Sequence, residues 1–285
     1  MVGRATMSED RSGNCSPEVC DETSGRLEGS LELDLRKAYQ NGEFELFYQP
    51  LVNLERDEVS GFEALLRWHH PERGLIPPGD FVPLAEEIGL IVPIGEWVLR
   101  RACEDAARWP ANIKIAVNLS PVQFRNRGLV QAVMSALAHS ALPASRLELE
   151  ITESVLLGET EGNLATLHSL RALGASISMD DFGTGYSSLS YLRTFPFDKI
   201  KIDRSFVNEM MERPDCIAII RAVAGLGISL GIATTAEGVE TNDQLVCLRA
   251  EGCTEIQGYL VSPPRPVGDV WRLLARNDSR AVAAG

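Results

Sequence analysis

Acidic, amide and lysine side chains recur at the ends of short strand-like segments of this chain. They are Gln49, Glu63, Asn118, Glu150, Asp180, Asp181, Lys201, Glu237 and Gln257. The carboxylates and the Asn118 amide oxygen form an all-oxygen set, which suits hard divalent cations, Mg²⁺ or Mn²⁺, rather than zinc. Two such cations about 3.5–4 Å apart can bind a phosphodiester and activate a water molecule for in-line attack. Lys201 could orient or deprotonate that water.

Alternating patterns indicate the strands that must position these side chains. Apolar residues alternate with Glu148 and Glu150 in one segment and with Lys199 and Lys201 in another. A period of two predicts strands with one apolar face and one polar face. Strands are expected at residues 43–51, 59–68, 113–118, 146–151, 175–181, 199–203, 230–237 and 255–259.

Helical patterns separate most of these strands. A first helix should begin near Leu31 and end at Gly42. Further helices are expected at residues 80–88, 94–109, 121–140, 158–173, 186–193, 205–212, 214–227, 241–251 and 266–275. The linker between the first two strands is too short for a helical crossover, so these strands should form an antiparallel hairpin. The pattern predicts an α/β fold, a (β/α)8 TIM-like barrel with an antiparallel first strand, whose mouth gathers the polar strand ends.

The composition is typical of a soluble protein with a large core. The chain has 285 residues, of which 45% are hydrophobic and 24% charged, and its net charge is −13. The acidic balance, without a Lys/Arg-rich stretch, argues against a polymeric nucleic acid partner. The six cysteines include no C-x-x-C pair, which favours a reduced cytoplasmic protein over a thiolate metal site or a disulfide framework. The apolar stretch 216–236 is interrupted by Arg221 and three glycines, which favours a buried helix and strand over a membrane span.

The folded region is expected at residues 31–275. Residues 1–30 are rich in Ser, Gly, Glu and Asp and lack the apolar core of a signal peptide, so they predict a disordered tail or linker. Residues 276–285 are expected to form a frayed carboxyl-terminal tail.

An ordered series of motifs covers nearly the whole of the folded region. They are GFEALLRW at 61–68, FVPLAE at 81–86, VNLS at 117–120, LELEITE at 147–153, DDFGTGYSSL at 180–189, IKID at 200–203, AEGVET at 236–241 and QGY at 257–259. Together they resemble the EAL domain family, the cyclic di-GMP-specific phosphodiesterases. The three-letter motif alone would be weak evidence, but the ordered set is very specific.

The resemblance implies a role for each matching residue. The implied metal ligands are Glu63, Asn118, Glu150 and Asp180 for one ion, with Asp180 bridging to a second ion that Asp181 and Glu237 also bind. The implied catalytic residues are Lys201, Glu63, Asp180, Glu153 and Gln257. The implied substrate-binding residues are Gln49, Leu65, Arg67 and Glu240. Within this set, Lys201 would act on the attacking water, and Glu153 resembles the glutamate that holds the loop after Asp180 in its metal-competent shape.

The implied reaction is metal-dependent hydrolysis of one phosphodiester of cyclic di-GMP to linear 5′-pGpG, which lowers this second messenger in bacterial signalling. Two alternatives remain: a catalytically silent cyclic di-GMP receptor or interaction module, and an enolase-type barrel lyase. The presence of every expected site residue favours the enzyme. The resemblance also implies a homodimer and a regulatory or GGDEF domain in the full-length protein. The sequence itself predicts no membrane insertion by this chain.

Overall fold

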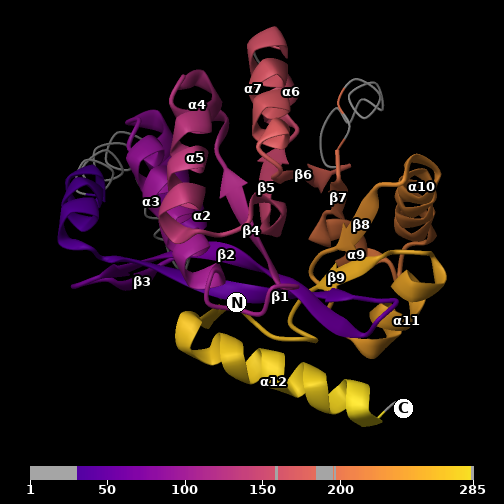
Figure 1. Ribbon diagram of the computed structural model, residues 1–285. Helices are drawn as coiled ribbons and strands as arrows, with labels where there is room; N and C mark the ends of the chain where they lie inside the picture. Colours follow the sequence, from indigo (N-terminus) through magenta and orange to yellow (C-terminus); the bar gives the residue numbers. More distant parts are fainter. Residues whose placement is uncertain (1–30, 158–159, 184–194, 196, 284–285) are drawn as a thin grey trace, which may run out of the picture.

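A long antiparallel hairpin opens the barrel in the computed structural model, which describes residues 31–157, 160–183, 195 and 197–283 (Figure 1). Its strands are β1 (Phe44–Asn53) and β2 (Glu58–His70). Gln49 of β1 lies directly opposite Glu63 of β2. The prediction of a hairpin is therefore confirmed, and it places two candidate site residues side by side.

Six strands follow β2 around the barrel, all parallel to it. They are β4 (Lys114–Leu119), β5 (Leu147–Thr152), β6 (Ser176–Phe182), β7 (Lys199–Ile202), β8 (Ala233–Ala236) and β9 (Glu255–Gln257). β1 pairs antiparallel with both β2 and β9, which closes the ring. The predicted (β/α)8 barrel with an antiparallel first strand is confirmed. Two short strands, β3 (Gly74–Ile76) and β10 (Arg265–Pro266), pair with β2 and β1.

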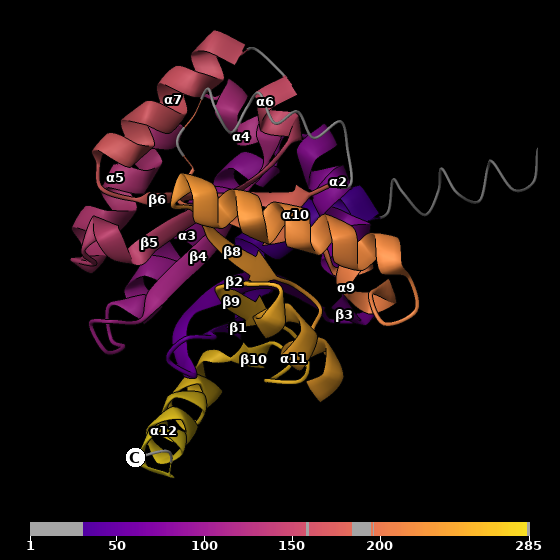
Figure 2. The same cartoon turned by 90° about the vertical axis from the view of Figure 1, so that its right-hand side faces the viewer.

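Helices surround the barrel (Figures 1 and 2), and Figure 1 shows α12 below the hairpin of β1 and β2. Residues 31–41 are helical, as predicted, and Gly42 follows with a positive φ of 71°. The other helices are α2 (Pro78–Glu87), α3 (Ile91–Ala106), α4 (Pro121–Arg125), α5 (Leu129–Ser140), α6 (Ser154–Leu157), α7 (Thr160–Ala172), α9 (Arg204–Glu209), α10 (Pro214–Leu230), α11 (Asn242–Ala250) and α12 (Val267–Ala283), with a 3₁₀ turn η1 (Ala144–Arg146).

Several predicted boundaries are wrong for identifiable reasons. The helix expected at 121–140 is interrupted between α4 and α5, where Asn126 has extended backbone angles. The strand expected at 230–237 begins only at Ala233, because α10 continues to Leu230 and ends at Gly231 with a φ of 69°. α12 continues well beyond the expected end at residue 275. The helix expected at 186–193 lies outside the described residues.

The outer faces of the strands pack against the helices and form the apolar core, which includes Phe62, Leu149 and Ile200. None of the described helices combines the length and the apolar character that crossing a membrane requires. The cysteines in the described part of the chain are free thiols; they are Cys103, Cys216, Cys247 and Cys253.

The inner faces of the strands form a charged interior with two layers. In the lower layer the Lys199 ammonium lies 2.9 Å from Glu148 and 2.7 Å from Glu255. Ser60 and Thr235 donate hydrogen bonds to the same Glu255 carboxylate, at 2.6 and 3.1 Å. Because inward side chains alternate along each strand, the residues two positions later form the upper layer, at the carboxyl ends of the parallel strands. The candidate site residues lie in this upper layer.

Candidate active site

Lys201 of β7 lies at the centre of the upper layer and is almost completely buried. Its ammonium lies 2.6 Å from Glu237 and 2.8 Å from Glu150. Asp180 and Glu63 are also close, at 3.2 and 3.7 Å. Four carboxylates from four different strands or strand ends therefore surround one positive charge, as the strand-end pattern predicts.

A hydrogen-bonded group orients Glu63 on the other side of the layer. The Gln257 side chain donates from Nε2 to Glu63 at 2.6 Å and to Gln49 at 3.0 Å. The Asn118 side chain donates from Nδ2 to the second Glu63 oxygen at 2.6 Å. Both oxygens of Glu63 thus accept a hydrogen bond. Asn118 makes this contact through Nδ2, so its amide oxygen takes no part in it.

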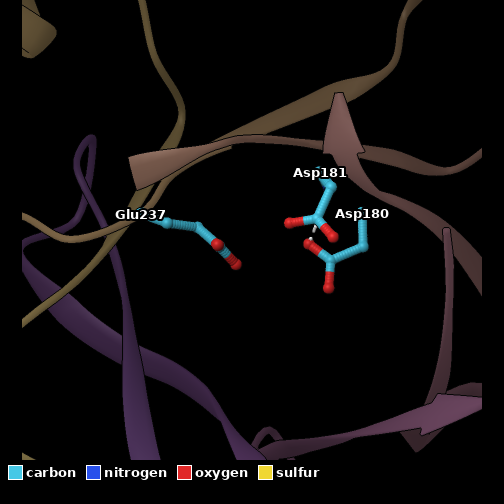
Figure 3. Close-up of side chains that lie close together, drawn as sticks. All are labelled: Asp180, Asp181 and Glu237. Atoms are coloured by element: carbon cyan, nitrogen blue, oxygen red, sulfur yellow. Dashed lines mark hydrogen bonds between the residues drawn. The ribbon is translucent and has the colours of Figure 1, made fainter. Parts of the chain in front are cut away.

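A β-bulge in β6 brings two consecutive aspartates to the mouth of the barrel. Met179 pairs with Ile200 and Phe182 pairs with Ile202, so β6 contains one more residue than β7 over this interval. Asp181 in the bulge has a left-handed backbone, with φ of 53°. Carboxylate oxygens of Asp180, Asp181 and Glu237 consequently lie within 4.8 Å of one another, and Figure 3 shows the three groups converging.

One ammonium cannot neutralise this many carboxylates, and their pKa values reflect the imbalance. Burial raises the pKa of Glu237 to about 7, although Lys201 opposes the shift. Burial also raises the pKa of Glu150 well above its ordinary value, and burial together with Asp180 raises the pKa of Asp181. Burial would lower the pKa of Lys201, but the surrounding carboxylates raise it well above its usual range. Without further cations, the site therefore retains protons on some carboxylates.

The upper layer opens into a cavity of about 500 Å³ at the mouth of the barrel. Its lining includes the predicted residues Gln49, Glu63, Leu65, Arg67, Asp180, Asp181, Lys201, Glu237, Glu240 and Gln257. Arg67 donates to the Leu66 carbonyl at 3.0 Å and lies over the Phe47 ring, 5.6 Å from its centroid, so its guanidinium is held at the cavity wall. The topology thus gathers residues from positions 49 to 257 around one opening.

Three predicted residues do not line this cavity. Glu150 lies beneath it against Lys201, and Asn118 reaches the site through Glu63. Glu153 is buried just after β5, away from the cavity wall. The cavity also contains residues that sequence reasoning missed: Asp203, Arg204, Asn208, Gly238, Gly258, Tyr259 and Pro264. Asp203 and Arg204 directly follow β7, so the same strand-end rule could have identified them.

The donor set of the upper layer fits divalent cations. The converging oxygens belong to carboxylates, which hard cations such as Mg²⁺ and Mn²⁺ prefer. The buried Glu150 Oε1 receives no hydrogen bond in the described part of the structure, which leaves a carboxyl oxygen that could bind a cation once Glu150 is deprotonated. Such a cluster can bind a phosphodiester only if its own negative charge is first compensated.

Comparisons with known proteins identify the family of this chain. A model of the EAL domain family matches residues 32–264. The chain is 55% identical over 258 residues to the Sinorhizobium fredii protein y4lL, covering 90% of this chain and 31% of that protein. It is 45% identical over 260 residues to the Pseudomonas aeruginosa bifunctional diguanylate cyclase/cyclic di-GMP phosphodiesterase MucR, covering 90% of this chain and 38% of MucR. The chain thus spans about a third of the length of these relatives.

Solved structures show the same barrel. The PaMucR phosphodiesterase in complex with cyclic di-GMP superposes with a TM-score of 0.82 at 46% identity, covering 85% of this chain and 99% of that one. The EAL enzyme Bd1971, with cAMP and cyclic di-GMP bound, gives a TM-score of 0.85 at 33% identity, covering 90% and 71% of the two chains.

Proposed function

The chain belongs to the EAL domain family, and from this premise we propose that it hydrolyses one phosphodiester of cyclic di-GMP to linear 5′-pGpG. The observation that carries the proposal is the intact acidic layer around Lys201, at the floor of a cavity at the barrel mouth. Relatives named as cyclic di-GMP phosphodiesterases, among them MucR and NbdA of Pseudomonas aeruginosa, support the choice of substrate.

We propose that the layer holds two divalent cations, Mg²⁺ or Mn²⁺. Glu63, Asn118, Glu150 and Asp180 would bind one ion, and Asp181 and Glu237 would bind the second together with Asp180. When bound, these ions supply Lewis-acid polarisation of the phosphodiester and lower the pKa of a bound water. The convergence of Asp180, Asp181 and Glu237 and the open oxygen of Glu150 support this assignment.

The protein's own groups position the reacting atoms. Lys201 carries a proton at Nζ, because its carboxylate neighbours raise its pKa, and so it can donate a hydrogen bond to the attacking water. Gln257 and Asn118 fix the two oxygens of Glu63, which holds this ligand in one orientation. Glu153, buried behind the end of β5, would hold the loop that follows Asp180.

The wall of the cavity offers groups that can grip a cyclic dinucleotide. Arg67 is held at the wall by the Leu66 carbonyl and the Phe47 ring, and its remaining N–H groups suit a phosphate or a base edge. Tyr259 is 64% exposed at the cavity and offers an aromatic face for stacking a guanine base. Gln49, Leu65 and Glu240 complete the proposed contacts.

Chromatography of cyclic di-GMP incubated with the protein tests the proposal. Linear pGpG should form with Mg²⁺ or Mn²⁺ and not with EDTA. Asp215→Asn changes an exposed carboxylate on α10 and should retain full activity; it is the control for Asp→Asn variants of the site. Binding of cyclic di-GMP without product under all metal conditions would instead identify a receptor.

The wider setting of the domain stays a prediction. MucR is named as both a cyclase and a phosphodiesterase, which supports a regulatory or GGDEF domain in a longer polypeptide. A homodimer is proposed from the family resemblance, and sedimentation equilibrium of the purified chain would measure it.

A further inference from the structure

Three strands of the barrel each carry one side chain of the lower layer and one of the upper layer. The two residues are two positions apart on each strand, so their side chains leave the same face about 6–7 Å apart. The pairs are Glu148 and Glu150 on β5, Lys199 and Lys201 on β7, and Glu255 and Gln257 on β9. Because the backbone between the two residues is extended, a displacement of the lower residue also moves the upper one.

The ion pairs of the lower layer join strands that are not neighbours in the sheet. Lys199 of β7 binds Glu148 of β5 although β6 lies between these strands, and it binds Glu255 of β9 although β8 lies between them. Ser60 of β2 donates to the same Glu255 carboxylate. Each of the three charged residues is at most 8% exposed, so water screens these ion pairs little. The contacts therefore cross the barrel interior and fix distances that backbone pairing does not set.

The backbone pairing around Lys201 is short and irregular. β8 and β9 are joined by two residue pairs. The register between β6 and β7 shifts directly after the pair of Met179 and Ile200, which is where Lys201 follows. Strand pairing alone thus determines the positions of Lys201 and Gln257 weakly.

The contacts of the upper layer tolerate little displacement. Lys201 Nζ lies 2.8 Å from Glu150, and Gln257 Nε2 lies 2.6 Å from Glu63. Hydrogen bonds weaken beyond a donor–acceptor distance of about 3.2 Å, and catalytic groups must be held within about 0.5 Å of their productive positions. A displacement of β7 or β9 by about 0.5–1 Å would therefore break one of these contacts.

Stability alone does not account for the charges of the lower layer. Burial of two carboxylates and one ammonium carries a large desolvation cost, and replacing such a network by uncharged residues is often neutral or stabilising. An ammonium that binds two carboxylates does, in contrast, fix the distance of two strands from its own strand.

We propose that Lys199 is a positioning residue, which holds β5 and β9 at the distances from β7 at which the contacts of the upper layer form. Through β5 it sets the distance between Glu150 and Lys201, and through β9 it sets the position from which Gln257 reaches Glu63. Lys199 does not line the acidic cavity and so acts through the residues two positions later. The inference rests on the hydrolytic function proposed above.

A neutral replacement of the lower layer separates positioning from stability. The triple variant Lys199→Met, Glu148→Gln and Glu255→Gln removes all three charges together, so it leaves no buried charge unpaired. It should unfold at a urea concentration close to that of the wild-type chain. Its kcat for cyclic di-GMP should nevertheless fall at least tenfold, with KM changed less than twofold. A folded triple variant with the kcat of the wild-type chain would overturn the proposal.

Lys199→Arg tests the same role with the charge retained. The longer, planar guanidinium must move the two carboxylates apart, so this variant should show the same loss of kcat at nearly unchanged KM. Lys114→Met, at an exposed position of β4, is the control for the loss of a lysine and should leave both constants unchanged. A Lys199→Arg variant that turns over as fast as the wild-type chain would count against the proposal even if the triple variant failed to fold.

The side-chain NH₂ signals of Gln257 in ¹H–¹⁵N spectra report its hydrogen bonds to Glu63 and Gln49 independently of turnover. They should move in Lys199→Arg and stay in place in Lys114→Met. Unchanged Gln257 signals in Lys199→Arg would refute the positioning role. If the signals move but the wild-type chain forms no pGpG, the hydrolytic function fails while the positioning of the upper layer stands.

Discussion

The affinity of the acidic cavity for Mg²⁺ should increase with pH, because Glu237 must lose its proton to bind a cation. Burial raises the pKa of Glu237 to about 7. Its protonated fraction therefore falls from about 90% at pH 6 to about 10% at pH 8, and the apparent Kd for Mg²⁺ should fall roughly tenfold over this interval. Glu150 and Asp181, whose pKa values are also raised, change the affinity in the same direction.

The same shift fixes the sign of the stability change in the metal-free protein. The folded protein keeps a proton on Glu237 up to about pH 7, whereas the unfolded chain releases it near the ordinary pKa of 4.5. The associated stability is fully present below the unfolded pKa and is lost as pH rises through the folded one, by about 3 kcal/mol. Mg²⁺ should restore it, so the difference in Tm between Mg²⁺ and EDTA should widen as pH rises.

Calorimetric titration of Mg²⁺ at pH 6, 7 and 8, at constant ionic strength, measures the affinity directly, and thermal unfolding with and without EDTA measures the stability. Glu237→Gln should bind Mg²⁺ more weakly and with a flatter pH dependence. Asp215→Asn, an exposed carboxylate, should leave the slope unchanged. An affinity that is constant or weaker at pH 8 in the wild-type chain would refute the reasoning.

Three further predictions test other parts of the structure. Asp180→Asn should abolish hydrolysis in the chromatographic assay without lowering the Tm measured in EDTA, because it removes one of several crowded carboxylates; near-normal turnover would contradict the metal assignment. Gly183→Ala should lower the free energy of unfolding by about 1–3 kcal/mol, since φ at this position is 102° and the new Cβ would lie 2.9 Å from the Phe206 ring. It should also reduce kcat, because Gly183 directly follows Asp181 and Phe182 in β6; an unchanged kcat would show that the backbone at Gly183 does not affect catalysis. Lys199→Met should lower the free energy of unfolding in urea by about 3–5 kcal/mol, because it leaves the buried Glu148 and Glu255 carboxylates unpaired. Adding Glu148→Gln to this variant should recover part of the loss. If Lys199→Met were as stable as the wild-type chain, the lower layer would not be a stabilising network.

Alternation was sufficient to predict the strands and the faces of their side chains. Glu148 and Glu150 do share one face of β5, and Lys199 and Lys201 share one face of β7. The short linker predicted the hairpin because no helix fits between β1 and β2. The pattern could not show that the polar faces are buried, since the same alternation describes a strand exposed to water on one side.

The arrangement of the aspartate pair could not be predicted from alternation. Consecutive residues of a regular strand point to opposite faces, so Asp180 and Asp181 would be separated without the bulge in β6. A bulge depends on the register with β7, which involves residues distant in sequence. Tyr259 was missed for a related reason, because it contributes to the cavity from a loop after β9 and not from a strand.

The reversed direction of β1 determines where a preceding segment meets the barrel. Phe44, at the start of β1, pairs with Trp68 near the carboxyl end of β2, so the chain enters the barrel on the side of the mouth. The helix at residues 31–41 is attached there, with Asp34 lying 3.4 Å from His70. In a barrel whose first strand is parallel, the entry point is on the opposite end. Here a segment that precedes residue 31 is attached on the side of the acidic cavity, through a helix that contacts the carboxyl end of the strand that carries Glu63.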